Sequence, residues 1–406
     1  MFNRKAKNIF TSSEFGRQMR FIAGPRQVGK TTLAKRYLAE VNCLNFYYNW
    51  DYKATRDRFR QNREFYLEDI YNRNKKLKDV WICFDEIHKI KKWKNILKEH
   101  FDKTENKIKT LVTGSARLDL FRKSGDSLAG RYFLFHLLPV SLGEITNDKS
   151  DYKDIGLSAK KFIENRLDNY ENKILEFEQL FNFSGFPEPL SKARKSFHNK
   201  WLDNYIERII YEDIRDLTRI QELDKVEDLI EILPERIGSL LSINSLSEIL
   251  EVNFRTTRNY LRALELGYFI FFLKPYKKSI SRALKKEQKV YFFDWTRITS
   301  LPKRFENFVA CELKNLITLF NDAGLGKAEQ FFIRTKDGKE TDFLITIDKK
   351  PWLLVEAKIK ADKIEKYYFN QANSLGNIPV LQLTYEHNII RKYSNNSYII
   401  SASRFF

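Results

Sequence analysis

Short apolar runs alternate with helix-like stretches through the first third of the chain. A continuous apolar run bounded by polar residues is typical of a strand that is buried on both faces, as in a parallel sheet. Five candidate strands occupy residues 19–23, 44–48, 80–84, 111–115 and 132–138, and a helix-like stretch follows the first of them at residues 32–40. This pattern predicts an α/β domain built on a parallel sheet.

A compact three-helix pattern and a hairpin are predicted in the second half of the chain. Ser245 is a good N-cap for a helix at residues 246–251, and a second helix ends at Gly267. The second helix places an apolar stripe on one face, formed by Phe254, Leu261 and Leu264. Apolar runs at residues 268–273 and 290–293 then predict a hairpin around a basic loop. Together these elements predict a winged helix-turn-helix.

The last hundred residues predict a helix, three strands, a second helix and a fourth strand. These elements occupy residues 305–319, 330–334, 341–347, 352–358, 362–372 and 380–385. The first two strands are joined through Asp337-Gly338, a typical hairpin turn.

The composition shows an excess of positive charge and indicates the cellular compartment of the protein. The chain of 406 residues carries 72 Lys and Arg against 53 Asp and Glu, a net charge of +19, which favours an acidic partner such as nucleic acid. Cys43, Cys83 and Cys311 lie far apart among apolar residues, which favours buried thiols of a cytosolic protein over disulfides or a metal site. The apolar stretches are far shorter than the ~20 residues of a spanning helix, so we expect a soluble cytoplasmic protein that does not enter a membrane.

Candidate chemistry is clearest at residues 24–31, which read Gly-Pro-Arg-Gln-Val-Gly-Lys-Thr between a strand and a helix. The glycines let successive backbone N–H groups face a polyphosphate, and the following helix adds its positive end. Lys30 can reach the β- and γ-phosphates, and Thr31 can coordinate Mg²⁺. The predicted nucleotide-binding residues are Gly24, Pro25, Arg26, Gln27, Val28, Gly29, Lys30, Thr31 and Thr32.

A second acidic element agrees with this phosphate loop. The run at residues 80–84 ends in Asp85-Glu86. Asp85 would hold Mg²⁺ through its inner or second shell, while Glu86, which is aimed differently, would polarise the attacking water. The alternative is a strand that simply ends in a solvated acidic turn, and the upstream phosphate loop makes that alternative weaker.

Two further positions could complete this site. A polar residue at the tip of the next strand would lie beside the γ-phosphate, and Ser115 is the first candidate, with Thr113 second. A turn-forming Gly-Ser pair explains Ser115 nearly as well. Arg131 could stabilise charge on the transferring phosphoryl group, from within the chain or from a neighbouring subunit. It could equally be one arginine among many.

The second helix of the winged pattern also carries a polar face opposite its apolar stripe. That face holds Arg255, Thr256, Arg258 and Arg262, and the hairpin loop adds Lys277, Lys278, Arg282, Lys285 and Lys286. These residue types meet phosphates and base edges in a major groove, so DNA is a predicted partner. The alternative is a winged fold that serves only in packing or dimerisation.

Four polar residues in the last hundred positions form another candidate site: Glu306, Asp342, Glu356 and Lys358. Asp342, followed after thirteen residues by Glu-x-Lys, resembles the core of PD-(D/E)xK nucleases, with Thr341 where the proline usually stands. In that chemistry Asp342 and Glu356 would bind one or two Mg²⁺ ions, Glu306 would complete the shell, and Lys358 would orient or help to deprotonate the attacking water. Such spacing also arises by chance in a Lys-rich chain, and this fold often persists without catalysis.

Several short motifs together resemble the prokaryotic AAA+-like ATPases of the AAA_14/DUF4143 type, which carry a carboxy-terminal domain of uncertain function. The motifs lie at residues 24–31, 85–86, 113–116, 128–131, 138–144, 185–189 and 211–216. The resemblance covers nearly the whole chain and implies ATP binding, with ATP and Mg²⁺ as cofactors and usually slow hydrolysis. It says little about the use to which ATP is put.

Four domains are therefore expected. An AAA+-like P-loop ATPase core, of the branch that carries its own catalytic glutamate (ASCE), occupies residues 1–147. A helical lid over the nucleotide follows at 148–222 and opens with a linker at 147–151. A winged helix-turn-helix spans 223–296, and a PD-(D/E)xK restriction-endonuclease-like α/β domain spans 297–406.

Two functions remain open from the sequence. In the first, an ATPase engine works with a winged helix and a nuclease-like domain that cut or grip DNA. In the second, ATP controls a switch whose carboxy-terminal domains are catalytically inactive platforms for protein interaction. A homo-oligomer is possible in either case, because an arginine finger supplied by a neighbour would require one.

Overall fold

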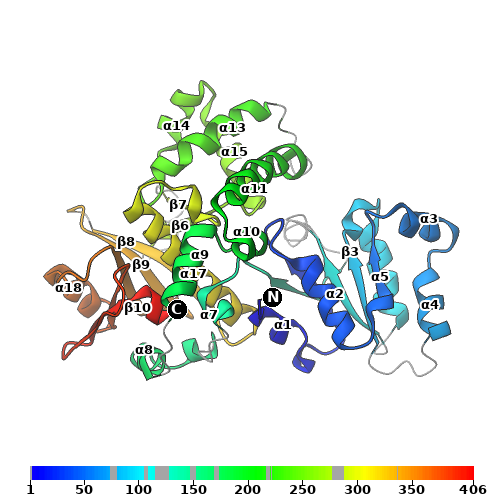
Figure 1. Cartoon of the computed structure of the whole chain (residues 1–406), viewed down its shortest axis with the longest axis horizontal. Coiled ribbons are helices and arrows are strands. Elements are labelled where there is room, and N and C mark those ends of the chain that lie inside the picture. The colour runs from blue at the N-terminus through cyan, green and yellow to red at the C-terminus, as the bar shows by residue number, and fades with distance from the viewer. Residues whose placement is uncertain are drawn as a thin grey trace. The chain divides into compact units, whose positions relative to one another are not determined.

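The computed structural model describes residues 2–73, 80–104, 108–114, 128–146, 152–168, 173–215, 220, 222–276, 288–335 and 337–406. The chain divides into an amino-terminal unit, Arg4–Leu138, and a carboxy-terminal unit formed mainly by Pro139–Phe406. Figure 1 labels the elements of both units.

The amino-terminal unit is built on a five-stranded sheet in the order β2-β3-β4-β1-β5. Its strands are β1 (Met19–Ala23), β2 (Tyr47–Asn49), β3 (Val80–Asp85), β4 (Ile108–Thr113) and β5 (Tyr132–His136). All four neighbouring pairs are parallel. Every residue of β1 and β3 is buried, which is why both strands read as mostly apolar runs, with Arg20 in β1 and Asp85 at the end of β3 as the charged exceptions. The parallel α/β sheet predicted from the sequence is confirmed.

One predicted strand is displaced along the chain. The run predicted at residues 44–48 begins with a 3-10 turn, Leu44–Phe46, and β2 follows it at Tyr47–Asn49. The apolar side chains of this segment therefore fit a turn as well as a strand. The displacement places Tyr47 and Asn49 within the sheet.

Helices of the amino-terminal unit flank this sheet (Figure 1). They are α1 (Lys5–Phe10), α2 (Lys30–Glu40), α3 (Lys53–Gln61), α4 (Phe65–Arg73) and α5 (Trp93–Thr104). The first turn of α2 directly follows the loop that leaves β1, and α2 packs against β3 and β4. The start of α2 therefore lies at the edge of the sheet where β1 ends.

The first part of the carboxy-terminal unit is helical, as the sequence predicts for residues 148–211. Its helices are α7 (Leu142–Ile145), α8 (Ala159–Asp168), α9 (Ile174–Phe183), α10 (Pro187–Lys192) and α11 (Lys195–Arg208), followed by a π-helical turn (Ile209–Ile214). The predicted linker at residues 147–151 lies outside the described residues. The role of this segment as a lid over the nucleotide stays a prediction.

Three helices and a hairpin come next in the chain: α13 (Leu223–Ile232), α14 (Ile243–Leu250), α15 (Phe254–Leu266), β6 (Ile270–Pro275) and β7 (Lys289–Phe292). Ser242, not Ser245, caps α14, because its hydroxyl accepts a hydrogen bond from the Ser245 N–H. Phe254 is 47% exposed, so it is not part of the buried face of α15. That face starts at Thr257 and includes Leu261 and Leu264. The basic residues between β6 and β7 lie outside the described residues.

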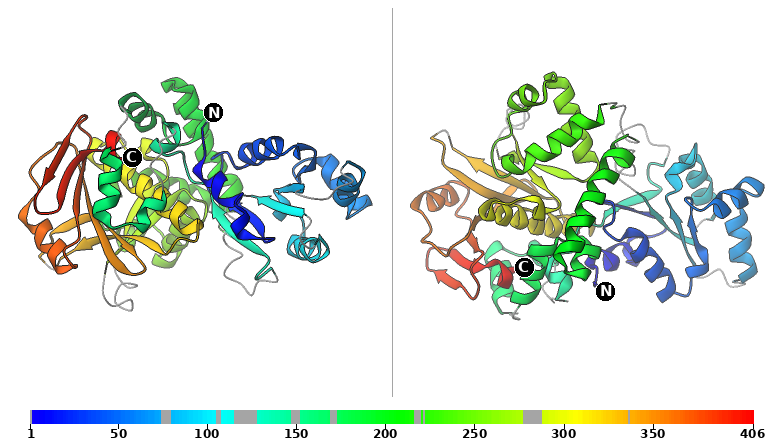
Figure 2. Two further views of the ribbon diagram at one scale, coloured as in Figure 1. Left: turned by 90° about the horizontal axis from the view of Figure 1, so that it is seen from below. Right: turned by 45° about the horizontal axis from the view of Figure 1, so that its top comes forward.

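The remaining strands form an eight-stranded sheet together with β6 and β7, and the long helix α17 (Leu301–Asp322) covers part of it, as the two views of Figure 2 show. Two further helices follow strands of this sheet. These strands and helices are β8 (Ala328–Arg334), β9 (Glu340–Ile347), β10 (Lys350–Lys358), α18 (Lys366–Ser374), β11 (Val380–Thr384), β12 (Ile390–Tyr393), β13 (Ser397–Ser401) and α19 (Ala402–Phe405). From α17 to β11 the order helix, three strands, helix, strand agrees with the sequence prediction.

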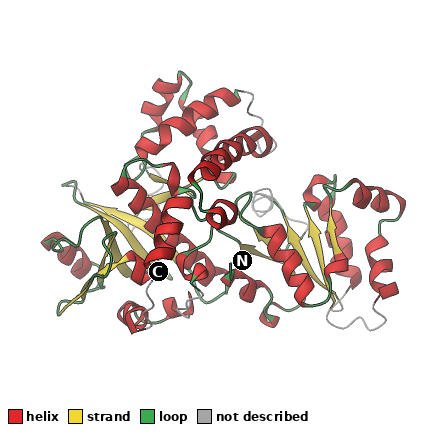
Figure 3. Cartoon of the chain, viewed as in Figure 1, coloured by secondary structure: helices red, strands yellow, loops and turns green. Residues whose placement is uncertain are grey.

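The hairpin of β6 and β7 joins this same sheet, since β6 pairs with β8. Figure 3 shows these strands together with the helices around them. The boundaries predicted at residues 147, 222 and 296 stay predictions.

The composition led to two expectations, one for the three cysteines and one for membrane-spanning helices. Cys43, Cys83 and Cys311 are buried free thiols, as predicted. In the described part of the chain, every helix is too short or too polar to cross a bilayer.

Candidate nucleotide-binding site

The carboxyl ends of the parallel strands bring the predicted residues to one edge of the amino-terminal sheet. The strand register pairs Ile22 with Thr113, Thr113 with Asp85, and Asp85 with Asn49. The loop after β1 therefore starts beside the last residues of β4 and β3. In open parallel sheets this is the edge at which ligands bind.

The loop between β1 and α2 needs glycine at two positions. Gly24 has a φ of +147°, and a Cβ added there would lie 2.1 Å from the carbonyl oxygen of Leu137. Gly29 has a φ of +96° and immediately precedes α2. Both conformations are strained for a residue with a side chain. The backbone thus takes the path that a phosphate-binding loop requires before a helix start.

Lys30 reaches back across this loop. Its ammonium donates hydrogen bonds to the carbonyl oxygens of Gly24, at 2.8 Å, and Pro25, at 2.6 Å. Arg4 supports the loop from the other side, since its guanidinium donates to the carbonyl oxygen of Val28 at 3.1 Å. A cation is therefore held within the loop, in the position from which it could meet phosphate oxygens.

Asp85 is the centre of a hydrogen-bonded cluster and is only 1% exposed. Thr31 donates to Asp85 Oδ2 at 2.9 Å, and the hydroxyl of Tyr47 donates to the same oxygen. Thr113 donates to Asp85 Oδ1, and the Asn49 amide lies 3.4 Å from Oδ2. Three hydroxyl groups thus converge on one buried carboxylate.

Tyr47 and Asn49 are two residues of this cluster that were not predicted from the sequence. Burial, followed by the hydrogen bond and the charge of Asp85, raises the pKa of Tyr47 above its usual range, so its hydroxyl stays protonated and remains a donor. Both residues could have been predicted from their position at the end of a strand beside β3. They were not, because that strand was predicted at residues 44–48 and lies at Tyr47–Asn49.

Glu86 leaves the sheet in a different direction from Asp85. It has a left-handed backbone, with φ of +59°, and its N–H donates to the carbonyl oxygen of Thr113 at 2.9 Å. Burial, followed by the charge of Asp85, raises the pKa of Glu86 to about 7. His88 Nε2 lies 3.4 Å from Glu86 Oε2. A carboxylate with a pKa near neutrality is suited to accept a proton.

Of the two remaining predicted residues, one lies outside the described residues and the other lies away from the site. Ser115 lies outside the described residues, whereas Thr113, the second candidate, contacts Asp85. The carbonyl oxygen of Arg131 accepts from the N–H of Met19, the first residue of β1, while the phosphate loop follows the last residue of that strand. Arg131 is therefore at the opposite edge of the sheet, where it pairs with Asp102 at 2.9 Å. An arginine finger from within the chain is not supported at this position.

The predicted DNA-binding residues lie on the outer face of α15. Arg255, Arg258 and Arg262 are exposed and Thr256 is half-buried, and the Thr256 N–H donates to the Asn253 side chain at 2.9 Å. With the residues that the structure describes, the three arginines form no ion pair. Their charge is therefore available to an acidic partner.

The four residues predicted as a nuclease centre converge. The N–H of Asp342 donates to Glu356 Oε2 at 3.1 Å, and Lys358 Nζ lies 2.9 Å from Glu356 Oε1. Glu306 joins them through Lys289, which the sequence analysis missed and which lies 3.2 Å from Glu306 Oε1. Burial, followed by the charge of Asp342, raises the pKa of Glu306 to about 7 and that of Glu356 to about 8.

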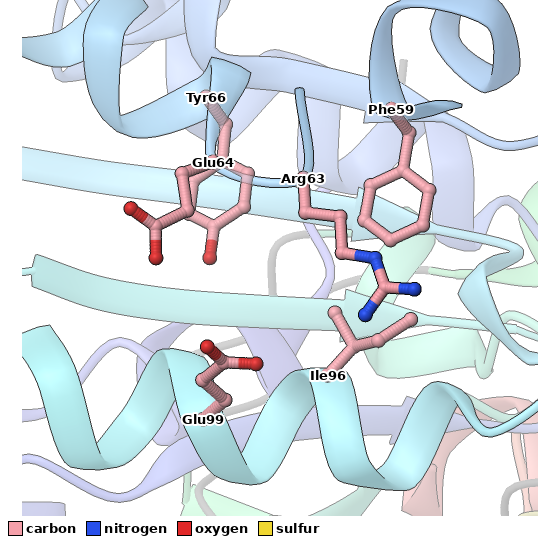
Figure 4. Close-up of a pocket in the computed structure, with 6 residues that line it drawn as sticks. All are labelled: Phe59, Arg63, Glu64, Tyr66, Ile96 and Glu99. Atoms are coloured by element: carbon pink, nitrogen blue, oxygen red, sulfur yellow. The ribbon is translucent and has the colours of Figure 1, made fainter. Parts of the chain in front are cut away.

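A separate small pocket lies between α5 and the segment from α3 to α4 (Figure 4). It is lined by Phe59, Arg63, Glu64, Tyr66, Ile96 and Glu99. Lys103 forms ion pairs with both Glu64 and Glu99. The lining contains none of the predicted site residues, and its two carboxylates already share a cation.

Comparison with known families supports the class of the amino-terminal unit. Residues 16–146 match the family described as AAA domain. This match, the parallel sheet and the phosphate loop support an AAA+-like P-loop ATPase fold for this unit. Residues 174–301 match a domain of unknown function, DUF8612. The DUF4143 resemblance and the nuclease resemblance stay predictions.

Relatives of the chain carry names without an assigned function. Two uncharacterized proteins of Methanocaldococcus jannaschii are 27% identical over 293 residues and 26% identical over 290 residues, and each alignment covers 68% of this chain. The chain spans 60% of the length of both relatives. An uncharacterized protein of Mycobacterium bovis is 23% identical over 343 residues, which are 82% of this chain and 68% of that protein.

Two solved structures resemble the chain at low similarity. The Orc1 protein of Aeropyrum pernix in complex with DNA gives a TM-score of 0.30 at 12% identity, covering 75% of this chain and 90% of that chain. The replication initiator DnaA bound to AMPPCP and single-stranded DNA gives a TM-score of 0.29 at 14% identity, covering 64% and 86% respectively.

Proposed function

We propose that the chain binds ATP and hydrolyses it with Mg²⁺ at the carboxyl edge of the amino-terminal sheet. One observation carries this proposal: the Thr31 hydroxyl lies 2.9 Å from Asp85 Oδ2, directly after the loop that holds Lys30. The match of residues 16–146 to the AAA domain family supports the same activity.

The residues around Asp85 fit Mg²⁺. The ion prefers oxygen ligands, and one or two carboxylates complemented by phosphate oxygens are its usual set. Asp85 and Thr31 offer such oxygens at one point, and within the described residues the buried Asp85 carboxylate accepts hydrogen bonds from three hydroxyls and one amide and from no basic side chain. Asp85 and Thr31 would hold the ion, which would supply positive charge against the charge that develops on the phosphate oxygens.

The chain's own groups then have distinct roles. The N–H groups of the phosphate loop and the start of α2 bind the phosphates. Lys30 exchanges its bonds to the Gly24 and Pro25 carbonyls for bonds to phosphate oxygens. Glu86 accepts a proton from the attacking water, for which its raised pKa suits it.

We propose further that α15 associates with DNA. Its three exposed arginines, without ion pairs to described residues, support this role, and so does the net charge of +19. Nonspecific phosphate contacts of this kind weaken steeply with salt. The salt dependence of DNA affinity is therefore the first test of this role.

A second candidate role for α15 is a platform for a protein partner in an ATP-controlled switch. Ile249 on α14 and Phe254 on α15 are 49% and 47% exposed, and exposed apolar side chains near arginines are typical of protein interfaces. If the protein does not bind DNA even at low salt, this role is favoured over the first.

The ATPase proposal is tested by Asp85→Asn. The amide keeps an oxygen but loses the negative charge, so it should bind Mg²⁺ more weakly than the carboxylate, and ATP turnover should fall by about 100-fold. Asp102→Asn is the matched control. Asp102 is on α5 of the same unit and pairs with Arg131, which lies beside Met19 at the start of β1 and therefore away from the phosphate loop. Turnover in Asp85→Asn equal to that in Asp102→Asn would refute the proposed Mg²⁺ site.

A further inference from the structure

Lys289 lies among three carboxylates in the carboxy-terminal unit. Its side chain is only 1% exposed. Its ammonium nitrogen lies 2.7 Å from Glu340 Oε1, 3.2 Å from Glu306 Oε1 and 3.6 Å from Asp342 Oδ1. The lysine comes from β7, while the carboxylates come from β9 and α17. One buried cation therefore joins three elements.

The surrounding charges are largely balanced from within the chain. Arg334 lies 3.2 Å from Glu340 Oε2, and Lys358 lies 2.9 Å from Glu356 Oε1. Burial would lower the pKa of Lys289, but Glu306, Asp342 and Glu340 outweigh it and raise that pKa above its usual range. Lys289 therefore stays charged, and each carboxylate of the cluster has a cationic neighbour.

Tyr291 and Gly238 contact the Glu306 carboxylate as well. The hydroxyl of Tyr291 donates to Glu306 Oε1 at 2.7 Å. At Gly238, where φ is +73°, an added Cβ would lie 2.7 Å from Glu306 Oε2. The backbone of Gly238 thus covers the carboxylate on another side, and only a residue without a side chain fits there.

This arrangement does not fit a divalent metal. Mg²⁺ and its relatives require several oxygen ligands at ~2.0–2.6 Å. An ammonium at 2.7–3.6 Å from three carboxylates fills the point where those oxygens converge. Among the described residues, no group of three or more His, Cys, Asp and Glu side chains is arranged to hold a metal ion.

We propose that the ammonium of Lys289 takes the place of a divalent cation among Glu306, Glu340 and Asp342, so that this centre binds neither Mg²⁺ nor Mn²⁺. The carboxy-terminal unit then does not cut nucleic acid through a divalent ion held by these three carboxylates. This inference concerns a different unit from the ATPase site and does not depend on ATP hydrolysis.

Manganese binding to the nucleotide-free full chain tests this proposal directly. Asp342→Asn is the informative variant, because an asparagine oxygen can still accept the hydrogen bond from the Ala357 N–H, which is 3.0 Å from Asp342 Oδ2. Electron paramagnetic resonance should count the same number of bound Mn²⁺ ions in the wild type and in Asp342→Asn. One more ion in the wild type would overturn the proposal, and so would Mn²⁺-dependent plasmid nicking that Glu356→Ala abolishes.

Removal of the internal cation gives the complementary test. Lys289→Met should gain one Mn²⁺ site, and the double variant Lys289→Met with Asp342→Asn should lose it again. Lys327→Met, at a lysine whose side chain is 65% exposed, is the control and should gain none. A Lys289→Met protein with native circular dichroism and no added Mn²⁺ site would contradict the proposal. If that variant does not fold, the comparison of the wild type with Asp342→Asn decides the matter.

Discussion

Thr31 Oγ1 and Asp85 Oδ2 lie 2.9 Å apart, although their residues are 54 positions apart in the chain. Thr31 is in the first turn of α2, and Asp85 ends β3, which β4 separates from β1. The hydrogen bond therefore joins the phosphate loop to the acidic strand end across an intervening strand. A hydroxyl and a carboxylate held in this way form the metal-facing half of the proposed ATP site.

Glu86→Gln should separate binding of ATP from its hydrolysis. The amide cannot accept a proton, so turnover should fall by about 100- to 10,000-fold while ATP remains bound. Rapid-quench turnover and equilibrium binding of labelled ATP measure the two effects. Glu14→Gln, at an exposed position of the same unit, should behave as the wild type. Hydrolysis that survives in Glu86→Gln would refute the assignment of the general base.

Tyr47→Phe should destabilise the nucleotide-free protein. It removes one donor from the buried Asp85 carboxylate, and the loss of a hydrogen bond to a charged group costs about 1.5–3 kcal/mol. Tyr52→Phe is the control, because Tyr52 is 53% exposed and its change should stay within about 0.5 kcal/mol. Urea unfolding measures both. Equal stabilities of the two variants would show that the Tyr47 hydroxyl does not support Asp85.

His100→Gln should make the protein less sensitive to acid. His100 packs against Tyr66 and Phe84, with its Nε2 2.8 Å from Thr110 Oγ1. Burial lowers the pKa of His100 to about 3, whereas an unfolded histidine has a pKa of about 6.5. The unfolded chain therefore binds a proton that the folded chain does not. The contribution of His100 to stability is full above pH ~6.5 and declines toward pH ~3, by up to about 1.4 kcal/mol per pH unit.

Glutamine can keep the hydrogen bond to Thr110 and does not titrate in this range. Urea unfolding of the full chain between pH 7 and pH 4 should therefore show a shallower loss of stability in His100→Gln than in the wild type. The slopes should differ by about one proton. Identical slopes would mean that His100 is not the group that takes up this proton.

Local patterns were enough to predict the phosphate loop and the acidic strand end. Gly24 and Gly29 are required by backbone geometry within a few residues of Lys30, so the motif carries its own structural reason. β1 and β3 are buried on both faces and are therefore visible as apolar runs. Their parallel register then brings Asp85 to the loop without further information.

Contacts between distant segments could not be predicted in this way. Lys289 is one lysine in a Lys-rich chain, and only the pairing of β7 with its neighbours brings it to Glu306 and Asp342. Arg131 is an exception, because it directly precedes a predicted strand of a parallel sheet, and that position already lies opposite the end where the phosphate loop leaves β1. Ser242 caps α14 in place of Ser245 because the helix starts one turn earlier than its apolar residues suggest.

Arg258→Ala should weaken DNA binding in a salt-dependent manner. The exposed guanidinium of α15 would contact a phosphate, so its loss should reduce affinity for DNA of any sequence and lower the salt slope by about 1. Fluorescence anisotropy at several salt concentrations measures the slope. Arg60→Ala, at an arginine whose side chain is 75% exposed and paired with Asp57, should leave it unchanged. If the affinity of the wild type for DNA does not vary with salt, the proposal that α15 binds DNA phosphates is contradicted.

Titration calorimetry of ATP with Mg²⁺ into the full chain, its Lys30→Ala variant and its Arg36→Ala variant is the most direct test of the ATP site. Arg36 is on the same helix as Lys30 and pairs at the surface with Glu40. The wild type and Arg36→Ala should each bind one ATP per chain, and Lys30→Ala should bind none. A wild type that binds no nucleotide, or a Lys30→Ala variant that binds ATP as tightly as the wild type, would contradict the assignment of the phosphate loop.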